Sequence, residues 1–223
     1  MKIIISLGGS LLTRELSAKN FKKYADVLIK LKKKGHKLVV VCGGGKTARE
    51  YQKIVKDYGV SKELQDMIGI VATHLNAMTL LSILKNYAFS RVLKTPTEVK
   101  KYFNKKILVC AGNLPGHSTD YDAALFAKAV KADLLINATN IDGVYSSDPR
   151  KNPKAKKFDK LSYKDFEKII SKNLQAPGKY GLFDLKATKL IRKEKIRTVI
   201  INATNPEEII KAMKGKHKGT IIS

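Results

Sequence analysis

The strongest constraint on the fold is the alternation of short, nearly continuous apolar runs with longer amphipathic stretches. Residues 3–7 and 38–42 are apolar runs of strand length, and residues 18–34 between them carry their apolar side chains along one helical stripe. A strand that is apolar on both faces belongs to a parallel sheet buried on both sides. The alternation therefore predicts an α/β fold with a mainly parallel central sheet covered by helices on both faces.

The same pattern continues to the end of the chain. We expect further strands at residues 91–94, 107–111, 133–138, 198–202 and 220–222. We expect further helices from about residue 47 onward, after an N-cap at Ser61, and at residues 96–103, 120–130, 162–170, 183–195 and 206–213. The helix after Ser61 should have its apolar side at Leu64, Ile68, Val71, Leu75 and Met78. No linker or repeat interrupts the pattern, so residues 1–223 are expected to form a single domain.

Composition narrows the class of protein. The apolar fraction of 43% supports a sizeable core, and no continuous apolar run approaches the ~18 residues of a membrane span. The N-terminus reads as a strand and not as a secretory signal, so we expect a cytoplasmic protein with no membrane partner. Cys42 and Cys110 each end an apolar run and should be buried, reduced thiols. The net charge of +25 favours anionic ligands, but no motif for specific nucleic-acid recognition is present.

The stretch VVVCGGGKTAREY, residues 39–51, indicates an anion site. A buried strand runs into Gly43, Gly44 and Gly45, and a helix follows, so bare N–H groups and the positive end of a helix dipole face the turn. Lys46 and Arg49 add positive charge. A P-loop is excluded because Val40 stands where its first glycine belongs, and contiguous glycines do not fit the dinucleotide pattern. By itself the triplet fits a plain tight turn equally well.

Four polar, glycine-bearing loops follow predicted strands: residues 8–10, 43–45, 112–120 and 139–149. Ligands of parallel sheets bind beyond the carboxyl ends of the strands, so all four loops should meet at one edge of the sheet. This convergence predicts a phosphate-binding site more strongly than any single loop.

Together these loops resemble the amino acid kinase family, and within it the archaeal type of UMP kinase. The matching segments cover almost the whole chain: IISLGGSLL, VVVCGGGKTAREY, LQDMIGIVATHLNAM, residues 112–157 from GNLPGHSTDYD through TNIDGVYSSDP, and KGTII. The resemblance implies an α/β/α sandwich in which the N-terminal part mainly forms the UMP site and the C-terminal part the ATP site. It also implies Mg²⁺ accompanying ATP and a homohexamer.

The resemblance carries residue roles with it. ATP would be bound by Gly8, Gly9, Ser10, Gly45, Arg49, Thr139, Asn140, Tyr145 and Asp148. UMP would be bound by Gly44, Asp66, Leu114, Pro115, Gly116, His117, Ser118, Thr119 and Asp120, with Asp66 on the ribose hydroxyls. Many members have a Lys where this chain has Ser6, so the cation that bridges the phosphates must come from elsewhere; the candidate catalytic cations are Lys46, Arg49 and Lys186. No protein ligand to a metal is expected.

Several of these residues also have plain structural explanations. Asp66 could be a surface charge on a helix, Tyr145 a core residue, His117 a loop-surface histidine and Asp148 the end of a turn. Asp142 more readily shapes a turn than contacts a ligand.

The function implied is transfer of the ATP γ-phosphate to UMP, giving UDP and ADP in pyrimidine nucleotide synthesis. A phosphate acceptor needs no strong general base, which agrees with the absence of a nucleophile–histidine arrangement in the sequence. The alternatives are another small-molecule kinase of the same family, such as isopentenyl phosphate kinase, or a non-catalytic nucleotide- or nucleic-acid-binding protein. Isopentenyl phosphate kinases usually have Gly-Ser-Phe-Gly-His after the triplet, and GGGKTAREY here disfavours that alternative.

Overall fold

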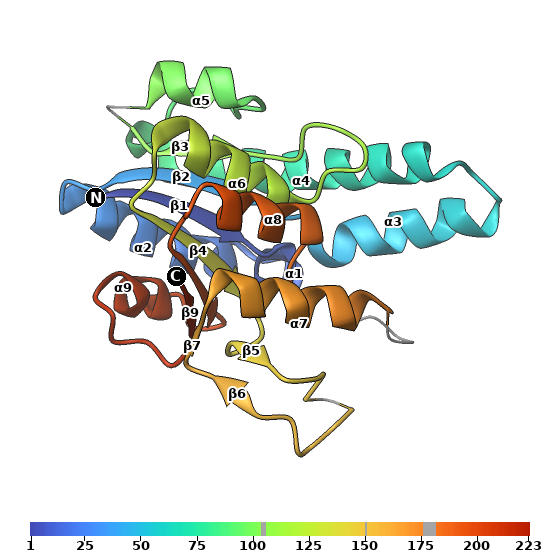
Figure 1. The fold of residues 1–223 in the computed structure, drawn as a ribbon. Coiled ribbons are helices and arrows are strands. Elements are labelled where there is room, and N and C mark those ends of the chain that lie inside the picture. The colour runs from blue at the N-terminus through green and yellow to red at the C-terminus, as the bar shows by residue number, and fades with distance from the viewer. Residues whose placement is uncertain (104–105, 150, 176–181) are drawn as a thin grey trace.

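The computed structural model describes residues 1–103, 106–149, 151–175 and 182–223, with the backbone only for 173–175. Within these residues a seven-stranded sheet has the order β3-β2-β1-β4-β8-β9-β7 (Figure 1). Its strands are β1 (Lys2–Leu7), β2 (Lys37–Cys42), β3 (Leu108–Cys110), β4 (Leu134–Thr139), β7 (Lys160–Leu161), β8 (Thr198–Asn202) and β9 (Thr220–Ile222). All neighbouring strands are parallel except β8 and β9. The mainly parallel sheet predicted from the sequence is confirmed.

Helices cover both faces of the sheet. One face carries α1 (Gly9–Thr13), α2 (Ala18–Lys33), α4 (Lys62–Leu84), the 3₁₀ turn η1 (Lys85–Tyr87) and α9 (Glu207–Met213). The other carries α5 (Pro96–Tyr102), α6 (Thr119–Val130), α7 (Tyr163–Gln175) and α8 (Leu185–Lys193). The helix α3 (Gly45–Asp57) pairs with the outer half of α4 and projects beyond the sheet (Figure 1). The paired strands β5 (Val144–Tyr145) and β6 (Lys157–Phe158) lie below α7 in the same view. The expected α/β/α sandwich is therefore confirmed.

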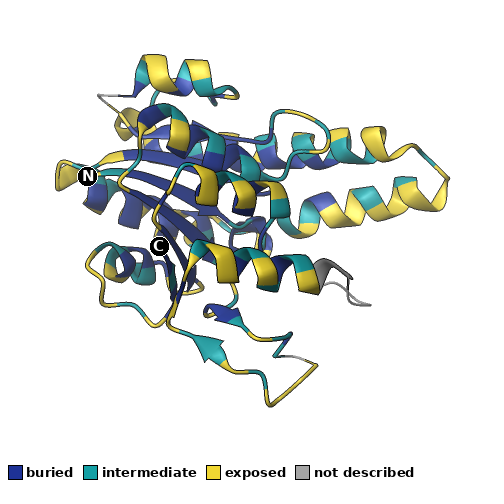
Figure 2. Ribbon diagram, viewed as in Figure 1, coloured by how far each residue is buried: buried dark blue, intermediate teal, exposed yellow. Residues whose placement is uncertain are grey.

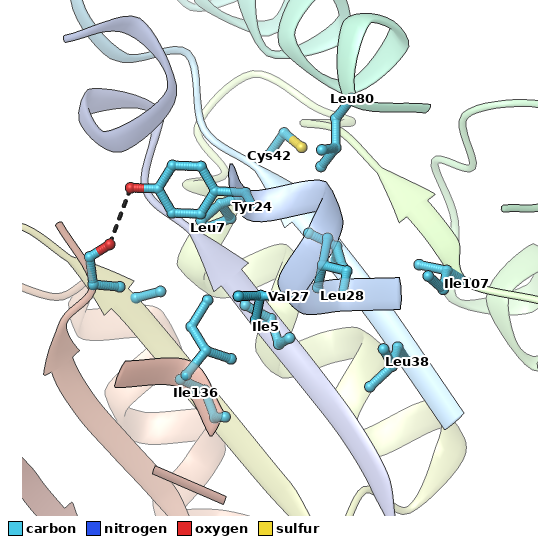
Figure 3. Packing of buried hydrophobic residues seen from close by; sticks show 14 of the residues in the cluster. Ile5, Leu7, Tyr24, Val27, Leu28, Leu38, Cys42, Leu80, Ile107 and Ile136 are labelled. Carbon is cyan, nitrogen blue, oxygen red and sulfur yellow. Dashed lines mark hydrogen bonds between the residues drawn. The ribbon is translucent and has the colours of Figure 1, made fainter. Parts of the chain in front are cut away.

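The layer beneath α2 shows how the apolar pattern produces the fold. Leu28 and its neighbours on the inner stripe of α2 pack on Ile5 and Ile136 of the central strands (Figure 3). Tyr24 is buried there as well, and its hydroxyl donates a hydrogen bond to the carbonyl of Ala203 at 3.0 Å. Burial raises the pKa of Tyr24 to about 12, so the phenol stays neutral and can keep this bond. The bond ties α2 to the segment that follows β8.

The sequence-based expectation for the long helix α4 is wrong about which side faces the core. Leu64, Val71, Leu75 and Met78 are more than half exposed, whereas the side that packs into the core carries Ala77, Leu80 and Leu84. Figure 2 shows this exposed side along α4 and α3. The helix is apolar on two sides, so periodicity alone could not tell which side packs on the sheet. By length and mean hydropathy the segment Lys62–Tyr87 would even suffice to cross a membrane, although polar residues such as Thr73, His74 and Asn76 interrupt its apolar runs.

One predicted strand is also wrong. Residues 91–94 form no named strand; only Leu93 makes an isolated parallel bridge, to Cys110. Arg91 instead turns outward to Glu98, with 2.7 Å between its guanidinium nitrogen and the carboxylate. The bond from the Lys94 amide, then the Arg91 pair and the bond from the Thr95 amide, lower the pKa of Glu98 to about 2, and these contacts fix the start of α5.

Candidate active site

The four loops selected from the sequence lie at one edge of the sheet. Leu7, the last residue of β1, pairs in register with Cys42 at the end of β2 and with Ala138 near the end of β4. β3 continues the same alignment, since Cys110 pairs with Val41. Because these strands are parallel and end at the same level, the loops that follow them leave the sheet side by side. This is the arrangement in which parallel sheets bind ligands.

The first two glycine loops touch each other through their backbones. A Cβ atom added to Gly9 would lie 2.1 Å from the amide nitrogen of Gly45 and 2.5 Å from the carbonyl carbon of Gly43. A Cβ on Gly43 would lie 2.6 Å from the Gly9 nitrogen. Gly45 also has a φ of +66°, which favours glycine. These glycines are therefore required by the close approach of two loops, and not only by the turn of each loop.

Two polar side chains lock this contact in place. The Thr13 hydroxyl donates to the carbonyl of Gly9 at 2.9 Å and accepts the amide of Lys46 at 2.8 Å, joining α1 to the first turn of α3. The buried Asn76 of α4 donates to the carbonyl of Gly43 at 2.7 Å. The positive end of the α3 dipole is thus held at the edge of the sheet, where anions bind.

The loop at residues 114–120, called here the UMP loop after its expected ligand, is anchored by the residues expected to serve the same site. The Asp66 carboxylate of α4 accepts the amide of Gly116 at 2.8 Å. The Lys186 ammonium, in the first turn of α8, donates to the Gly116 carbonyl at 3.1 Å. Leu114 is half exposed at the start of the loop, and Pro115 is partly buried beside it. Asp66 is therefore no isolated surface charge, because it contacts the UMP loop directly.

The end of the UMP loop begins the helix α6. The Ser118 hydroxyl caps this helix by accepting the amide of Tyr121 at 3.1 Å, with Thr119 and Asp120 in the first turn. The His117 ring lies 3.3 Å from the buried carboxylate of Asp122 and packs edge-on against Tyr121. Asp122 thus orients the imidazole. The sequence reading did not identify Asp122.

Asp120 forms a buried polar cluster with two strands. Ser6 of β1 and Asn137 of β4 pair in register, and their side chains donate to the same Asp120 oxygen at 2.8 and 3.0 Å. Burial, helped by the nearby Asp184, outweighs the lowering effect of the two hydrogen bonds and raises the pKa of Asp120 to about 6. Many family members would have a Lys at this position of the first strand. Here the residue is Ser6, and its hydroxyl is used in the hydrogen bond to Asp120. The lone Asn in the apolar run LLINAT was the signal for this cluster that the sequence reading missed.

The three candidate cations differ in how firmly they are held. Lys46 and Arg49 lie on the first turns of α3, and both are exposed. Lys46 makes a loose ion pair with Glu50 at 3.5 Å, and Arg49 makes no ion pair within the described part of the chain. Only Lys186 is fixed to another part of the site. The side chain of Lys186 is thus held against the UMP loop, whereas Arg49 is exposed at the start of α3.

The loop after β4 carries the residues expected to line the adenosine pocket. Thr139 ends β4, Asn140 is exposed, and Tyr145 in β5 is partly buried, donating its hydroxyl to Asp142 at 2.9 Å. Asp142 and Tyr145 therefore brace one another, and Tyr145 is not a core residue. Asp148 is buried, and its carbonyl accepts the amides of residues 151 and 152 in the turn that follows.

Comparisons with known proteins agree with this geometry. The sequence profile of the amino acid kinase family matches residues 1–202. A uridylate kinase from Methanococcus vannielii is 42% identical over 225 residues, covering 100% of this chain and 99% of that protein. A uridylate kinase from Methanocaldococcus jannaschii is also 42% identical, over 226 residues and the same shares of the two chains.

Solved structures give the same result. The crystal structure of uridylate kinase from Archaeoglobus fulgidus matches with a TM-score of 0.88 at 41% identity, covering 100% of both chains. UMP kinase from Bacillus anthracis matches with a TM-score of 0.84 at 25% identity, covering 100% of this chain and 95% of the other. With the profile match and full-length relatives near 40% identity, the chain belongs to the amino acid kinase family.

Proposed function

We propose that this protein transfers the γ-phosphate of ATP to UMP, giving UDP and ADP for pyrimidine nucleotide synthesis. One observation carries the proposal: two sets of contacts lie at the same edge of the sheet. In the first, the two glycine loops touch each other directly. In the second, Asp66 and Lys186 both hydrogen-bond to Gly116 of the UMP loop. The full-length similarity to uridylate kinases supports UMP as the acceptor.

The residues at this edge of the sheet form two groups, one for ATP and one for UMP. Gly8, Gly9, Ser10 and Gly45 present backbone next to the ATP phosphates, and Thr139, Asn140, Tyr145 and Asp148 hold the adenosine. The UMP loop and Gly44 take UMP, with Asp66 on its ribose. Phosphoryl transfer depends mainly on alignment and on stabilising charge in the transferring group. Fixed amides and cations do this without rearranging.

Two cations have distinct roles in this proposal. Lys186 is held beside the UMP loop by Gly116, so it can bridge the acceptor phosphate and the transferring group. Arg49, exposed at the start of α3, folds onto the ATP phosphates when they bind, and Lys46 adds to the same positive field. Asp120 is a positioning residue that fixes the start of α6 against the two central strands.

Mg²⁺ is proposed to enter with ATP. Among the described residues no group of three or more histidine, cysteine or acidic side chains could cage a metal ion. This fits Mg²⁺ in phosphoryl-transfer sites, which is held largely by the substrate phosphates and water with one or two carboxylates. Among the residues that the structure describes, Asp120 and Asp184 are two candidate carboxylates for this role, and the charge of Asp184 helps to raise the pKa of Asp120. A bound Mg²⁺ would neutralise part of the charge on the phosphates.

A direct acceptor comparison tests the function. With ATP as donor, UMP, CMP, isopentenyl phosphate and acetylglutamate are each offered to the purified protein, and UMP should be preferred by orders of magnitude. Inertness toward UMP would refute the proposal. Binding of RNA that persists as salt rises, and that exceeds the affinity for UMP, would favour a nucleic-acid-binding protein instead.

We further propose a homo-oligomer, a hexamer by the family resemblance, in which the exposed apolar side of α3 and α4 forms one of the contacts. The neighbouring helices α3 and α4 both expose large apolar side chains: Tyr51 and Ile54 on α3, Tyr58 directly after it, and Leu64, Met67, Val71, Leu75 and Met78 on α4. Clustered exposed apolar side chains commonly mark a protein–protein contact. Val71→Glu combined with Leu75→Glu should lower the mass measured by light scattering; an unchanged mass would place the contact elsewhere. We also propose the cytoplasm as the site of the reaction, in agreement with the two buried free thiols.

A further inference from the structure

A cavity of about 590 Å³, lined mostly by polar residues, lies at the same edge of the sheet, on the far side of the loop after β4. Its walls come from that loop and β6, from the carboxyl end of β8 with the start of α9, and from the segment before β9. The main polar residues around it are Asp142, Lys157, Asn202, Lys211, Lys216 and Lys218. No residue expected to bind ATP or UMP lines it. Its volume is within the range of small-molecule sites, about 300–1,000 Å³.

The cavity is positively charged. Four lysines line it, against two carboxylates, Asp142 and Glu208. Glu208 is already paired with Lys211 at 2.6 Å, and Asp142 accepts the Tyr145 hydroxyl. Lys216 and Lys218 make no ion pair with any residue that the structure describes. Two ammonium groups at the rim are therefore available to an anion.

The lysine-bearing wall is held firmly against the sheet. A Cβ atom added to Gly219 would lie 2.1 Å from the carbonyl oxygen of Ile200, so the backbone before β9 presses directly on β8. The Gly219 amide donates to the His217 ring at 3.1 Å. From the opposite wall, the Lys157 ammonium donates to the Lys218 carbonyl at 2.6 Å and closes the cavity at one end. A rigid wall lowers the entropic cost of holding a ligand.

The cavity walls are bonded directly to the loop that is expected to hold ATP. The amide of Ala203, between two cavity residues in sequence, donates to the carbonyl of Thr139 at 2.8 Å. The amide of Val144 donates to the Thr220 hydroxyl, next to Gly219, at 2.8 Å. A ligand held between the two walls therefore acts on the ATP loop, residues 139–145, at its start through Ala203 and at its end through Thr220.

We propose that this cavity binds a second phosphate-bearing anion of the polyphosphate class, separate from the two substrates, and that its occupation changes the affinity for ATP. Lysines act as point charges suited to several phosphates, and a larger ligand would also contact the side chain of Ile201 and the lysine stems. Binding of the anion is inferred from the cavity and its lysines alone. The change in the affinity for ATP depends, in addition, on the proposed function.

Calorimetry tests the binding without an activity measurement. Inorganic tripolyphosphate is titrated into the full-length protein, already saturated with UMP and a non-hydrolysable ATP analogue so that the substrate sites are filled. The cavity variant combines Lys216→Gln with Lys218→Gln. The matched control combines Lys19→Gln with Lys23→Gln, two exposed lysines of α2 that lose the same charge away from the cavity. The affinity for tripolyphosphate should fall about tenfold or more in the cavity variant and less than about twofold in the control.

The outcomes separate the parts of the proposal. Absence of binding to the saturated protein, or equal loss in both variants, would overturn the site and leave only a general attraction to positive charge. CTP as a second titrant distinguishes a nucleotide from free polyphosphate: tighter binding of CTP assigns a contribution to the base and sugar. Tripolyphosphate should also shift the KM for ATP in the wild type and the control but not in the cavity variant. An unchanged KM with binding intact would refute the coupling, and inertness toward UMP would refute only the proposed function.

Discussion

Substitution of Asp120 by Asn should stabilise the protein more at high pH than at low pH. The structure raises the pKa of this carboxyl from 3.8 to about 6, so the native state holds its proton more tightly than the unfolded chain does. As the pH rises through about 4 the unfolded chain ionises first, and the free energy of unfolding falls until the native carboxyl also ionises near pH 6. Above that pH the cost of the buried charge is fully present.

The size of the effect follows from the shift. Roughly two pKa units correspond to about 3 kcal/mol at most, and the partial exposure of Asp120 reduces this to about 1–3 kcal/mol. The Asn oxygen can still accept the bonds from Ser6 and Asn137, so the substitution removes the charge and keeps the packing. Part of the free-energy cost of ionising Asp120 in the folded protein is already present at about pH 5. The free energy of unfolding of Asp120→Asn, relative to that of the wild type, should therefore rise by about 1 kcal/mol between about pH 5 and about pH 8.

The assay is urea unfolding of both proteins at the two pH values, without substrates. Asp57→Asn, at an exposed carboxylate of α3, is the control and should give the same change at both pH values. An advantage for Asp120→Asn that is constant, or that shrinks as the pH rises, would contradict the reasoning. It would mean that a cation already compensates the Asp120 charge in the folded protein.

Three further substitutions test the substrate sites. Asp66→Asn should raise the KM for UMP about tenfold or more and leave the KM for ATP nearly unchanged, because Asp66 anchors the UMP loop; equal rises in both constants would refute its ribose role. Gly9→Ala should abolish activity and lower the free energy of unfolding by several kcal/mol, because the added Cβ would overlap the backbone of the second glycine loop. Gly59→Ala is the control: its Cβ has open space, so only the positive φ opposes it and the loss should be about 1–2 kcal/mol. Urea unfolding measures both losses. Lys186→Met should lower kcat about 100-fold or more, whereas Lys189→Met on the exposed side of the same helix should keep wild-type rates; equal kinetics would remove Lys186 from the reaction.

Most of the fold could be predicted because it depends on periodicity that is read locally. The apolar runs at β1, β2, β4 and β8 are buried strands whose bounds differ from the predicted ones by at most one residue. The convergence of the loops then followed from the parallel order of the strands. The segment at residues 91–94 failed because a short apolar pair flanked by basic residues does not specify whether a full strand pairs.

The contacts inside the site were harder to predict because they join residues far apart in the sequence. The glycines could be read as an anion turn, but nothing in one loop shows that Gly9 presses on Gly45. The cluster around Asp120 joins positions more than 100 residues apart, and only the register of β1 against β4 brings them together. The roles assigned to the substrate-binding residues remain predictions, although the structure places those residues at one edge.

The backbone contact between the glycine loops also limits how the site can work. Because no side chain fits between Gly9 and Gly43, these two loops cannot slide past each other without breaking the contacts made by Thr13 and Asn76. The half of the site formed by these two glycine loops is therefore preorganised, and we expect adjustment to the substrates at the exposed tip of the UMP loop, where Gly116 is held by one bond from its amide to Asp66 and one from Lys186 to its carbonyl. A site of this kind should select its acceptor by closure of the UMP loop and bind the donor phosphates with little rearrangement.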